Sequence, residues 1–198
     1  MAKIYGPVTL VDVARSDLTQ ENLSPFPLCP EGWRVHDNMD LNLPDPPAAG
    51  DDLGIVSGTY GSATPSLQTP DLKAAGATTQ YARRLFQVPM NFVASQTMQI
   101  VLHAGMLTTI ADTSATADVQ CFLSDGEAGV TGADLCSTAA QSINSLTLAD
   151  KTFTIDATSL TAGDWLDIRI ALAINDGATA TAVKGIIGKA QLLCDTKG

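Results

Sequence analysis

The 198-residue chain has little of what most catalytic and metal-binding sites are built from. It holds only three glutamates and two histidines, His36 and His103, and no two of its cysteines or histidines lie two to four residues apart. That spacing excludes the usual zinc motifs, and the sequence lacks both a G-x-S-x-G nucleophile turn and a glycine-rich phosphate loop. We therefore expect no catalysis and no bound cofactor.

Basic residues and long apolar segments are also scarce. Lys and Arg number 11 against 21 Asp and Glu, which gives a formal net charge of −10. Nucleic-acid binding requires clustered cations, and a membrane-spanning helix requires about 20 apolar residues, so neither partner is expected. Residues 1–7 lack the apolar segment of a secretion signal, which predicts synthesis in the cytoplasm and four reduced cysteines.

Prolines are absent from the second half of the chain. All ten lie at or before Pro89, and eight lie at or before residue 65. Because proline removes a backbone hydrogen-bond donor, we predict an extended N-terminal arm at residues 1–50 that forms no layer of sheet. The remaining residues, 51–198, are predicted to form a single strand-rich body.

The arm carries four large apolar side chains that need cover from water, namely Phe26, Leu28, Trp33 and Leu41. Burial of each contributes roughly 1.5–3 kcal/mol before the cost of ordering the chain. We predict that the arm lies across other subunits and that these four residues form a subunit interface. On this hypothesis, deletion of residues 1–48 leaves a folded body that no longer assembles.

Apolar and polar residues alternate with period two along the body. The alternation covers residues 97–106, 117–124, 152–157, 164–175 and 186–194, and further strands are expected at 51–60, 78–88 and 139–147. This pattern predicts an all-β fold, an antiparallel jelly-roll sandwich of about eight strands. In the segment 186–194 the alternation places Ile186, Gly188 and Leu192 on the same face of the expected strand. The predicted core includes Ile100, Leu102, Val119, Cys121, Ile155, Leu166, Ile168, Ile170 and Leu192.

Three acidic segments and one pair of arginines lie outside this pattern. Residues 37–42, 51–52 and 125–127 offer the oxygen ligands that calcium prefers, but they lack the glycine and distal glutamate of an EF-hand loop. Solvated turns are the favoured interpretation, and a calcium site stays open as the alternative. Arg83 and Arg84 put one cation on each face of a strand, so one of them must pair with an acid, reach an edge or meet a neighbouring subunit.

The segment FTIDATSLTAGDWLDIR at residues 153–169 resembles the final hairpin of jelly-roll proteins that decorate or cement the capsids of tailed bacteriophages. In that family a Leu-x-x-Gly-Asp-x-Leu turn joins two long strands, and residues 160–166 match it. Residues 86–89 and 98–102 are similar to an earlier strand pair of the same family. The resemblance covers the body from about residue 50, whereas the arm matches nothing.

The resemblance implies a structural virion protein that decorates the outer surface of a capsid after synthesis in the host cytoplasm. Its implied partners are sister copies, as a homotrimer, and the major capsid or shell protein, and no catalytic residue carries over. The net negative charge is consistent with a position away from packaged DNA.

Two other classes of function compete with this one. One is a carbohydrate- or receptor-binding jelly-roll module of a virion or surface appendage, for which Trp165 and Tyr81 are the obvious aromatic candidates. An exposed Trp165 beside acidic residues would favour that class, and a buried Trp165 would assign it to the core. The other is a small cupin-type enzyme, which two distant histidines make a poor match.

Overall fold

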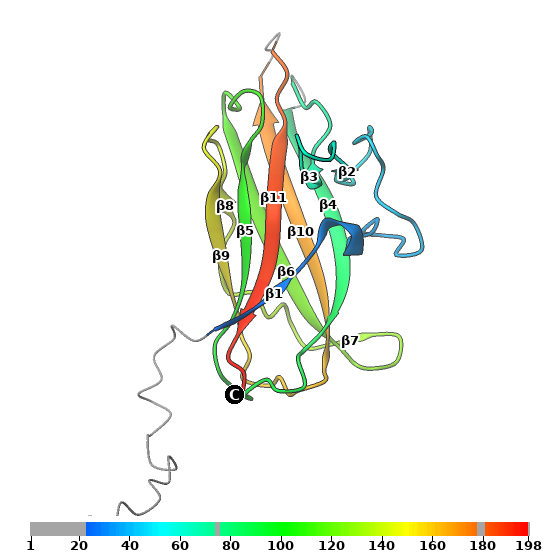
Figure 1. Ribbon diagram of the computed structural model, residues 1–198, viewed down its shortest axis with the longest axis vertical. Helices are drawn as coiled ribbons and strands as arrows, with labels where there is room; N and C mark the ends of the chain where they lie inside the picture. Colours follow the sequence, from blue (N-terminus) through cyan, green and yellow to red (C-terminus); the bar gives the residue numbers. More distant parts are fainter. Residues whose placement is uncertain (1–22, 74–75, 178–180, 198) are drawn as a thin grey trace, which may run out of the picture.

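Two antiparallel sheets face each other in the computed structural model, which describes residues 23–73, 76–177 and 181–197 (Figure 1). The strands are β1 (Ser24–Pro27), β2 (Gly54–Val56), β3 (Ser66–Gln68), β4 (Gly76–Gln87), β5 (Met98–Met106), β6 (Ser114–Ser124), β7 (Val130–Thr131), β8 (Gln141–Ser142), β9 (Ala149–Ile155), β10 (Trp165–Asp176) and β11 (Gly185–Cys194). A 3₁₀ turn at Pro30–Gly32 follows β1. The molecule is an all-β antiparallel sandwich of jelly-roll type, as the alternation predicts.

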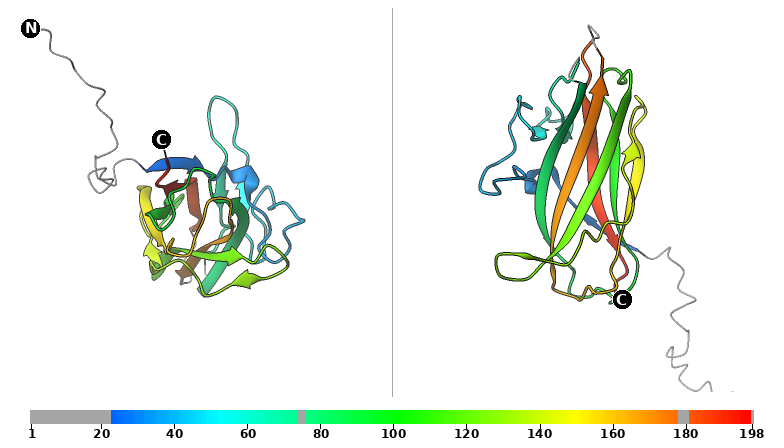
Figure 2. Two further views of the ribbon diagram at one scale, coloured as in Figure 1. Left: turned by 90° about the horizontal axis from the view of Figure 1, so that it is seen from below. Right: turned by 180° about the vertical axis from the view of Figure 1, so that it is seen from behind.

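Each sheet is organised around long central strands. The first sheet has the order β2-β3-β11-β5-β9, with β1 also paired to β11. The second has the order β4-β10-β6-β7, with β8 also paired to β6. Figure 2 shows the two layers from below, and from behind it shows β10 between β4 and β6. The strands expected at 51–60 and 139–147 are much shorter here, at Gly54–Val56 and Gln141–Ser142.

The hydrophobic core lies between the two sheets. All nine side chains that the alternation assigns to it are at most 2% exposed, which confirms the predicted core. Cys121 and Cys194 are among the buried residues, as expected of small thiols on inward faces. Among the helical segments that the structure describes, none has the length and apolar character needed to cross a membrane.

Strand β11 departs from regular alternation at Gly188. Its register with β5 shifts between Ile187 and Lys189, as in a β-bulge. A bulge adds one residue to one strand, so the side chains before it point to the face opposite the expected one. Ile187 is therefore buried in the core, and the prediction that Ile186 occupies this position is wrong.

The arm contributes a strand to the first sheet. Strand β1 pairs with residues 191–194 of β11, and Leu28 continues the pairing by donating its N–H to the carbonyl of Ala190 at 2.9 Å. Hydrogen-bonding positions alternate along an antiparallel edge strand, so Pro25 and Pro27 place their nitrogens on the unpaired side. The expectation that the prolines keep the arm out of any sheet is wrong for this segment.

Beyond β1 the arm crosses to the outer edge of β4 (Figure 1). Arg34 and Arg83 exchange two backbone hydrogen bonds of 2.9 and 3.0 Å. Tyr81 donates its N–H to Asp51 and accepts the N–H of Leu53, both at 2.7 Å. These bonds occupy backbone groups of an edge that would otherwise be open to pairing with another chain.

A tight turn leads into β10. Gly163, which precedes Asp164, has a φ of +93°. Residues that carry a side chain rarely adopt this backbone conformation. The Asp164 carboxylate accepts hydrogen bonds from the Thr161 N–H at 2.7 Å and from the Thr161 hydroxyl at 3.0 Å. The glycine and the aspartate thus fix the direction in which β10 starts.

Candidate binding groove on the outer face of the second sheet

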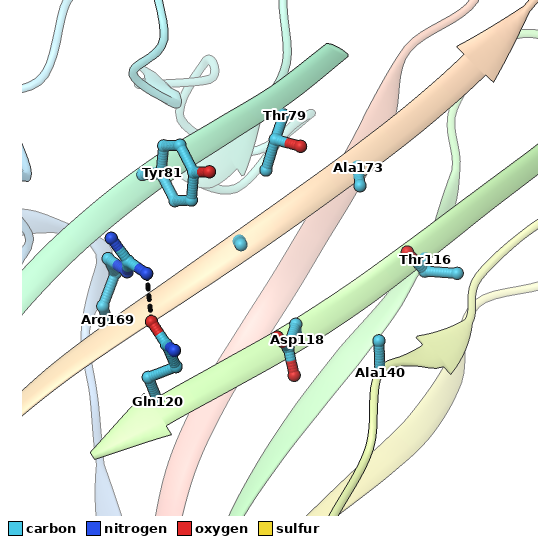
Figure 3. A pocket seen from close by; sticks show the side chains of 9 residues that line it. Thr79, Tyr81, Thr116, Asp118, Gln120, Ala140, Arg169 and Ala173 are labelled. Carbon is cyan, nitrogen blue, oxygen red and sulfur yellow. Dashed lines mark hydrogen bonds between the residues drawn. The ribbon is translucent and has the colours of Figure 1, made fainter. Parts of the chain in front are cut away.

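A groove runs along β10 on the face of the second sheet that points away from the core. Ala171 and Ala173 form its floor, because their side chains are smaller than those of the neighbouring strands. Opposite Ala171 stand Tyr81 on β4 and Asp118 on β6; opposite Ala173 stand two threonines, Thr79 and Thr116. The part of the groove that these residues line has a cavity volume of about 230 Å³ (Figure 3).

The groove continues along β10 in both directions. Beyond Ala173 a smaller depression of about 130 Å³ reaches Asn175, and on the other side two depressions follow one another past Arg169 to Asp167. Neighbouring depressions share lining residues, so they form a row along β10. Eight residues separate Asp167 from Asn175, which corresponds to ~27 Å of strand at the usual rise per residue.

Arg169 is held over the wall of the groove by two contacts. Its guanidinium carbon lies 4.8 Å from the centre of the Tyr81 ring, a cation–π geometry, and one of its nitrogens donates to the Gln120 side-chain oxygen. The imidazole of His36, from the arm, lies 4.7 Å from the same tyrosine ring. Figure 3 shows the Tyr81 hydroxyl directed toward β10, so this hydroxyl, and not the ring face, is offered to the groove.

Arg83 lies directly opposite Arg169 on β4, but it is neutralised. Its guanidinium binds both carboxylate oxygens of Asp167, with a distance of 2.7 Å from Nε to Oδ1. The hydrogen bond to Asp167 raises the pKa of Arg83 further above its ordinary value. Arg83 also donates to the His36 carbonyl at 3.4 Å, which ties the arm to this wall of the groove.

Arg84, on the other face of β4, is covered by the arm. It donates to the Cys29 carbonyl at 3.0 Å, and its burial lowers its pKa. A Cβ on Gly32 would lie 2.5 Å from the Arg84 guanidinium, so the absence of a side chain at this glycine makes room for the arginine. The two arginines of the sequence pattern thus meet an acid and the arm of their own chain.

The end of the groove near β7 is more apolar. Leu85, Phe122 and Val130 line the last two depressions. Trp165, at the start of β10, lies beyond these depressions on the same outward face, where it is 46% exposed and lines none of them. Backbone hydrogen bonds from Glu127 and Gly129 fix the loop carboxylate of Asp125 and lower its pKa.

The four residues predicted to form a subunit interface occupy different environments. Leu28 and Trp33 are 1% and 0% exposed within their own chain, and Phe26 packs against the core and the Phe86 ring. Leu41 is 53% exposed. The prediction that Leu28 and Trp33 need a second subunit to cover them is therefore wrong, because the sandwich of the same chain already buries both side chains.

This packing also bears on the predicted path of the arm. The described part of the arm lies on the same chain, and residues 1–22 lie outside the described residues. Deletion of residues 1–48 would remove core side chains and uncover the β4 edge, so we no longer expect it to leave a folded body. A subunit contact at Leu41 stays a prediction.

The histidines and acidic turns are not arranged as a hydrolytic site. His36 Nδ1 lies 3.0 Å from Asp52 Oδ1, and His103 Nδ1 lies 2.6 Å from Asp150 Oδ1. In the hydrogen bonds of the described residues, neither imidazole contacts a hydroxyl or thiol that could serve as a nucleophile. Asp125 acts as an ordinary turn residue.

One cluster could in principle accept a cation. His36, Asp37 and Asp52 each have a potential ligand atom, and these atoms all lie within 4.8 Å of one another. Hydrogen bonds from the His36 backbone and ring to Asp52 account for the arrangement without an ion. The calcium alternative therefore stays a prediction.

Sequence reasoning named Tyr81 and Trp165 as candidates but missed most of the groove. Both do lie on the outward face of one sheet, ~20 Å apart along β10 by the usual strand rise. Asp118, Gln120 and Arg169 lie within two segments whose alternation predicts strands, but the sequence does not show that these strands are paired. The missing information was that β4, β10 and β6 are neighbours, which alternation within one strand does not contain.

No protein-family model matches the chain, and no curated protein matches it either. A solved xylan-binding module, CBM15, aligns with a TM-score of 0.47 at 13% identity over 89% of this chain and 99% of its own. A mannan-recognising carbohydrate-binding module, TmCBM27, aligns with a TM-score of 0.44 at 14% identity over 88% and 98%. The infectious bursal disease virus Gx strain gives a TM-score of 0.35 at 11% identity over 77% and 37%. Since all three TM-scores lie below 0.5, these likenesses decide nothing about function.

Proposed function

We propose that the protein is a non-catalytic carbohydrate-binding module that holds a linear glycan in the groove along β10. The observation that carries this proposal is the row of depressions along β10, in one of which Ala171 and Ala173 form a floor between two walls of polar side chains. A row of open depressions along one strand fits an extended chain better than a compact small molecule, which would be enclosed on most sides.

The walls carry the hydrogen-bonding groups that sugar hydroxyls require. The Asp118 carboxylate accepts, the Thr79, Thr116 and Tyr81 hydroxyls both donate and accept, and the Gln120 amide adds two donors. The alanine floor leaves room for a sugar ring above the sheet. Side chains on a sheet are held in fixed relative positions, so little ordering is needed when a ligand binds.

The apolar end of the groove supplies a surface for the C–H face of a sugar. Trp165 is exposed and not part of the core, and Asp167 follows it on the same outward face. An exposed aromatic side chain near polar groups offers a large apolar area at low entropic cost. An exposed Trp165 near an acidic residue favours a sugar-binding role over a place in the core.

The proposal is tested with a glycan array followed by calorimetry on the oligosaccharides that bind. Ala171→Trp fills the floor of the groove without touching the core, and we expect at least a tenfold loss of affinity. Thr152→Trp adds the same side chain on the outer face of the other sheet and should bind as the unmodified protein does. Trp165→Ala is expected to weaken binding of longer chains, whereas Tyr60→Ala removes a fully exposed tyrosine outside the groove.

Two results would contradict the proposal. One is an array on which no glycan is retained. The other is undiminished binding by Ala171→Trp, since a ligand in the groove would collide with the new side chain.

Capsid decoration stays a second candidate, because a glycan-binding module can itself be part of a virion. The observation in its favour is the exposure of Tyr60 and Leu41, two large side chains on the loops of residues 34–65. The predicted homotrimer would require a cyclic three-fold contact, and these two side chains are the ones we propose for it. Light scattering of the purified protein tests this candidate, since a monomer at high concentration would contradict it.

A further inference from the structure

Arg169 carries a charge that no carboxylate of the described residues neutralises. The ion pairs of the described residues involve His36, Lys73, Arg83 and His103, and Arg169 is not among them. This arginine projects into the groove of a chain whose formal net charge is −10. Among the described residues Arg34 and Arg84 make no ion pair either, but both donate to backbone carbonyls of the arm, whereas Arg169 donates to a side-chain oxygen in the groove.

The acid that could have paired with Arg169 is occupied. Asp167 precedes it by two residues on β10 and therefore lies on the same face, but both of its oxygens bind Arg83. Asp118 lies on the diagonal position of β6, and it is not in the ion pairs formed among the residues that the structure describes. Because the Arg83 guanidinium already donates to both carboxylate oxygens of Asp167, the Arg169 guanidinium can bind the carboxylate of a ligand.

The free guanidinium is also held in place. The Tyr81 ring supports one side of it and the Gln120 oxygen accepts one of its N–H groups, as Figure 3 shows. A guanidinium has five N–H donors, and the hydrogen bonds of the described residues use one acceptor, Gln120. A fixed, planar, incompletely bonded guanidinium matches the geometry of a carboxylate, which it binds through two parallel hydrogen bonds.

We infer that the groove prefers glycans that carry carboxylates, such as uronic acid residues, with the acid group bound to Arg169. The inference rests on the proposed carbohydrate-binding function and names the class of glycan. The carboxylate would lie beside Arg169 and Gln120, and the hydroxyls of the same chain would face Asp118 and the two threonines. Asp118 sets the orientation, because a ligand carboxylate placed beside it would be repelled.

A purely structural role for Arg169 is the competing explanation. On that view its guanidinium only supports the Tyr81 ring, and it would have no influence on which glycan binds. The two explanations differ in one measurable quantity, the ratio of affinities for a carboxylated glycan and its uncharged counterpart.

The experiment uses two matched pairs of probes with the full chain. One pair is oligogalacturonate and its methyl ester, and the other is glucuronoxylan and the same xylan stripped of its uronic acid. We expect the acidic member of at least one pair to bind tenfold or more tightly, with the preference decreasing as salt concentration rises. Arg169→Gln should reduce the ratio to about one, because it weakens binding of the acidic member much more than binding of the uncharged member.

Two further variants serve as controls. Arg169→Lys should keep part of the preference, because it retains the charge but not the planar fork. Lys189→Gln removes one positive charge from the other sheet and should leave the ratio unchanged. A ratio that falls equally in Lys189→Gln would show a general charge effect and would overturn the inference.

The remaining outcomes separate this inference from the proposed function. Equal binding of acidic and uncharged members in both pairs would overturn the preference and leave glycan binding intact. An acid preference that persists unchanged in Arg169→Gln would also overturn it. Failure of all probes and of every glycan on an array would overturn both.

Discussion

Trp33 is the side chain that most directly tests whether the arm belongs to the fold. It is fully buried against its own chain, and its indole N–H donates to the Leu28 carbonyl at 3.3 Å. Replacement of a buried tryptophan by alanine costs about 3–5 kcal/mol through lost burial and the cavity that remains. A domain of ordinary stability has about 5–15 kcal/mol in total, so Trp33→Ala removes a large share of it.

Urea unfolding followed by circular dichroism measures this effect. We expect the midpoint to fall strongly in Trp33→Ala with little change in the slope, because the surface exposed on unfolding is nearly the same. Leu41→Ala is the matched control from the same arm, and its half-exposed side chain predicts a change within about 0.5 kcal/mol. An unchanged midpoint in Trp33→Ala would refute the assignment of the arm to the core and restore the case for a contact with another subunit.

Further predictions concern single groups. In the native protein a thiol reagent should modify exposed Cys29 readily and buried Cys194 only on unfolding. Burial raises the pKa of the Cys194 thiol from 9.0 to about 11. The unfolded chain therefore loses this proton at a lower pH than the folded protein, and the free energy of unfolding decreases as pH rises from 9.0 toward 11. Cys194→Ala should make this decrease smaller when urea midpoints are measured across that pH range. Asp167→Asn leaves Arg83 without its carboxylate partner and should lower the free energy of unfolding by about 1–3 kcal/mol. The loss is moderate because water partly solvates the arginine. A double-mutant cycle with Arg83→Gln measures the coupling energy of the pair. Gly163→Ala should cost about 1–2 kcal/mol by thermal unfolding, since its φ is +93°.

The inward face of the sandwich was largely predictable from the sequence. Period-two alternation needs no knowledge of neighbouring strands, so Ile100, Ile168 and Leu192 could be assigned to the core directly. The error at Ile186 arises from the bulge at Gly188, which depends on the register between β11 and β5. That register is a property of two strands together, and the sequence of one strand does not contain it.

The arm shows a different limit of sequence reasoning. The composition of the arm correctly predicts that Leu28 and Trp33 are buried, but it does not predict which surface buries them. The prolines argue against a central strand, yet β1 is an edge strand in which every second nitrogen needs no partner. Two prolines, Pro25 and Pro27, on either side of a partly buried Phe26 are compatible with such an edge strand, and the sequence contains this signal.

The wall of the groove and the arm are physically one unit, which links the fold to the proposed function. The backbone of Arg34 pairs with that of Arg83, whose side chain binds both Asp167 and the His36 carbonyl. The His36 ring in turn packs beside Tyr81, which supports Arg169. The arm therefore does more than cover an edge, because it fixes the strand from which the groove wall projects. An arrangement with so many contacts behind an open polar channel is expected of a site that must be rigid before its ligand arrives.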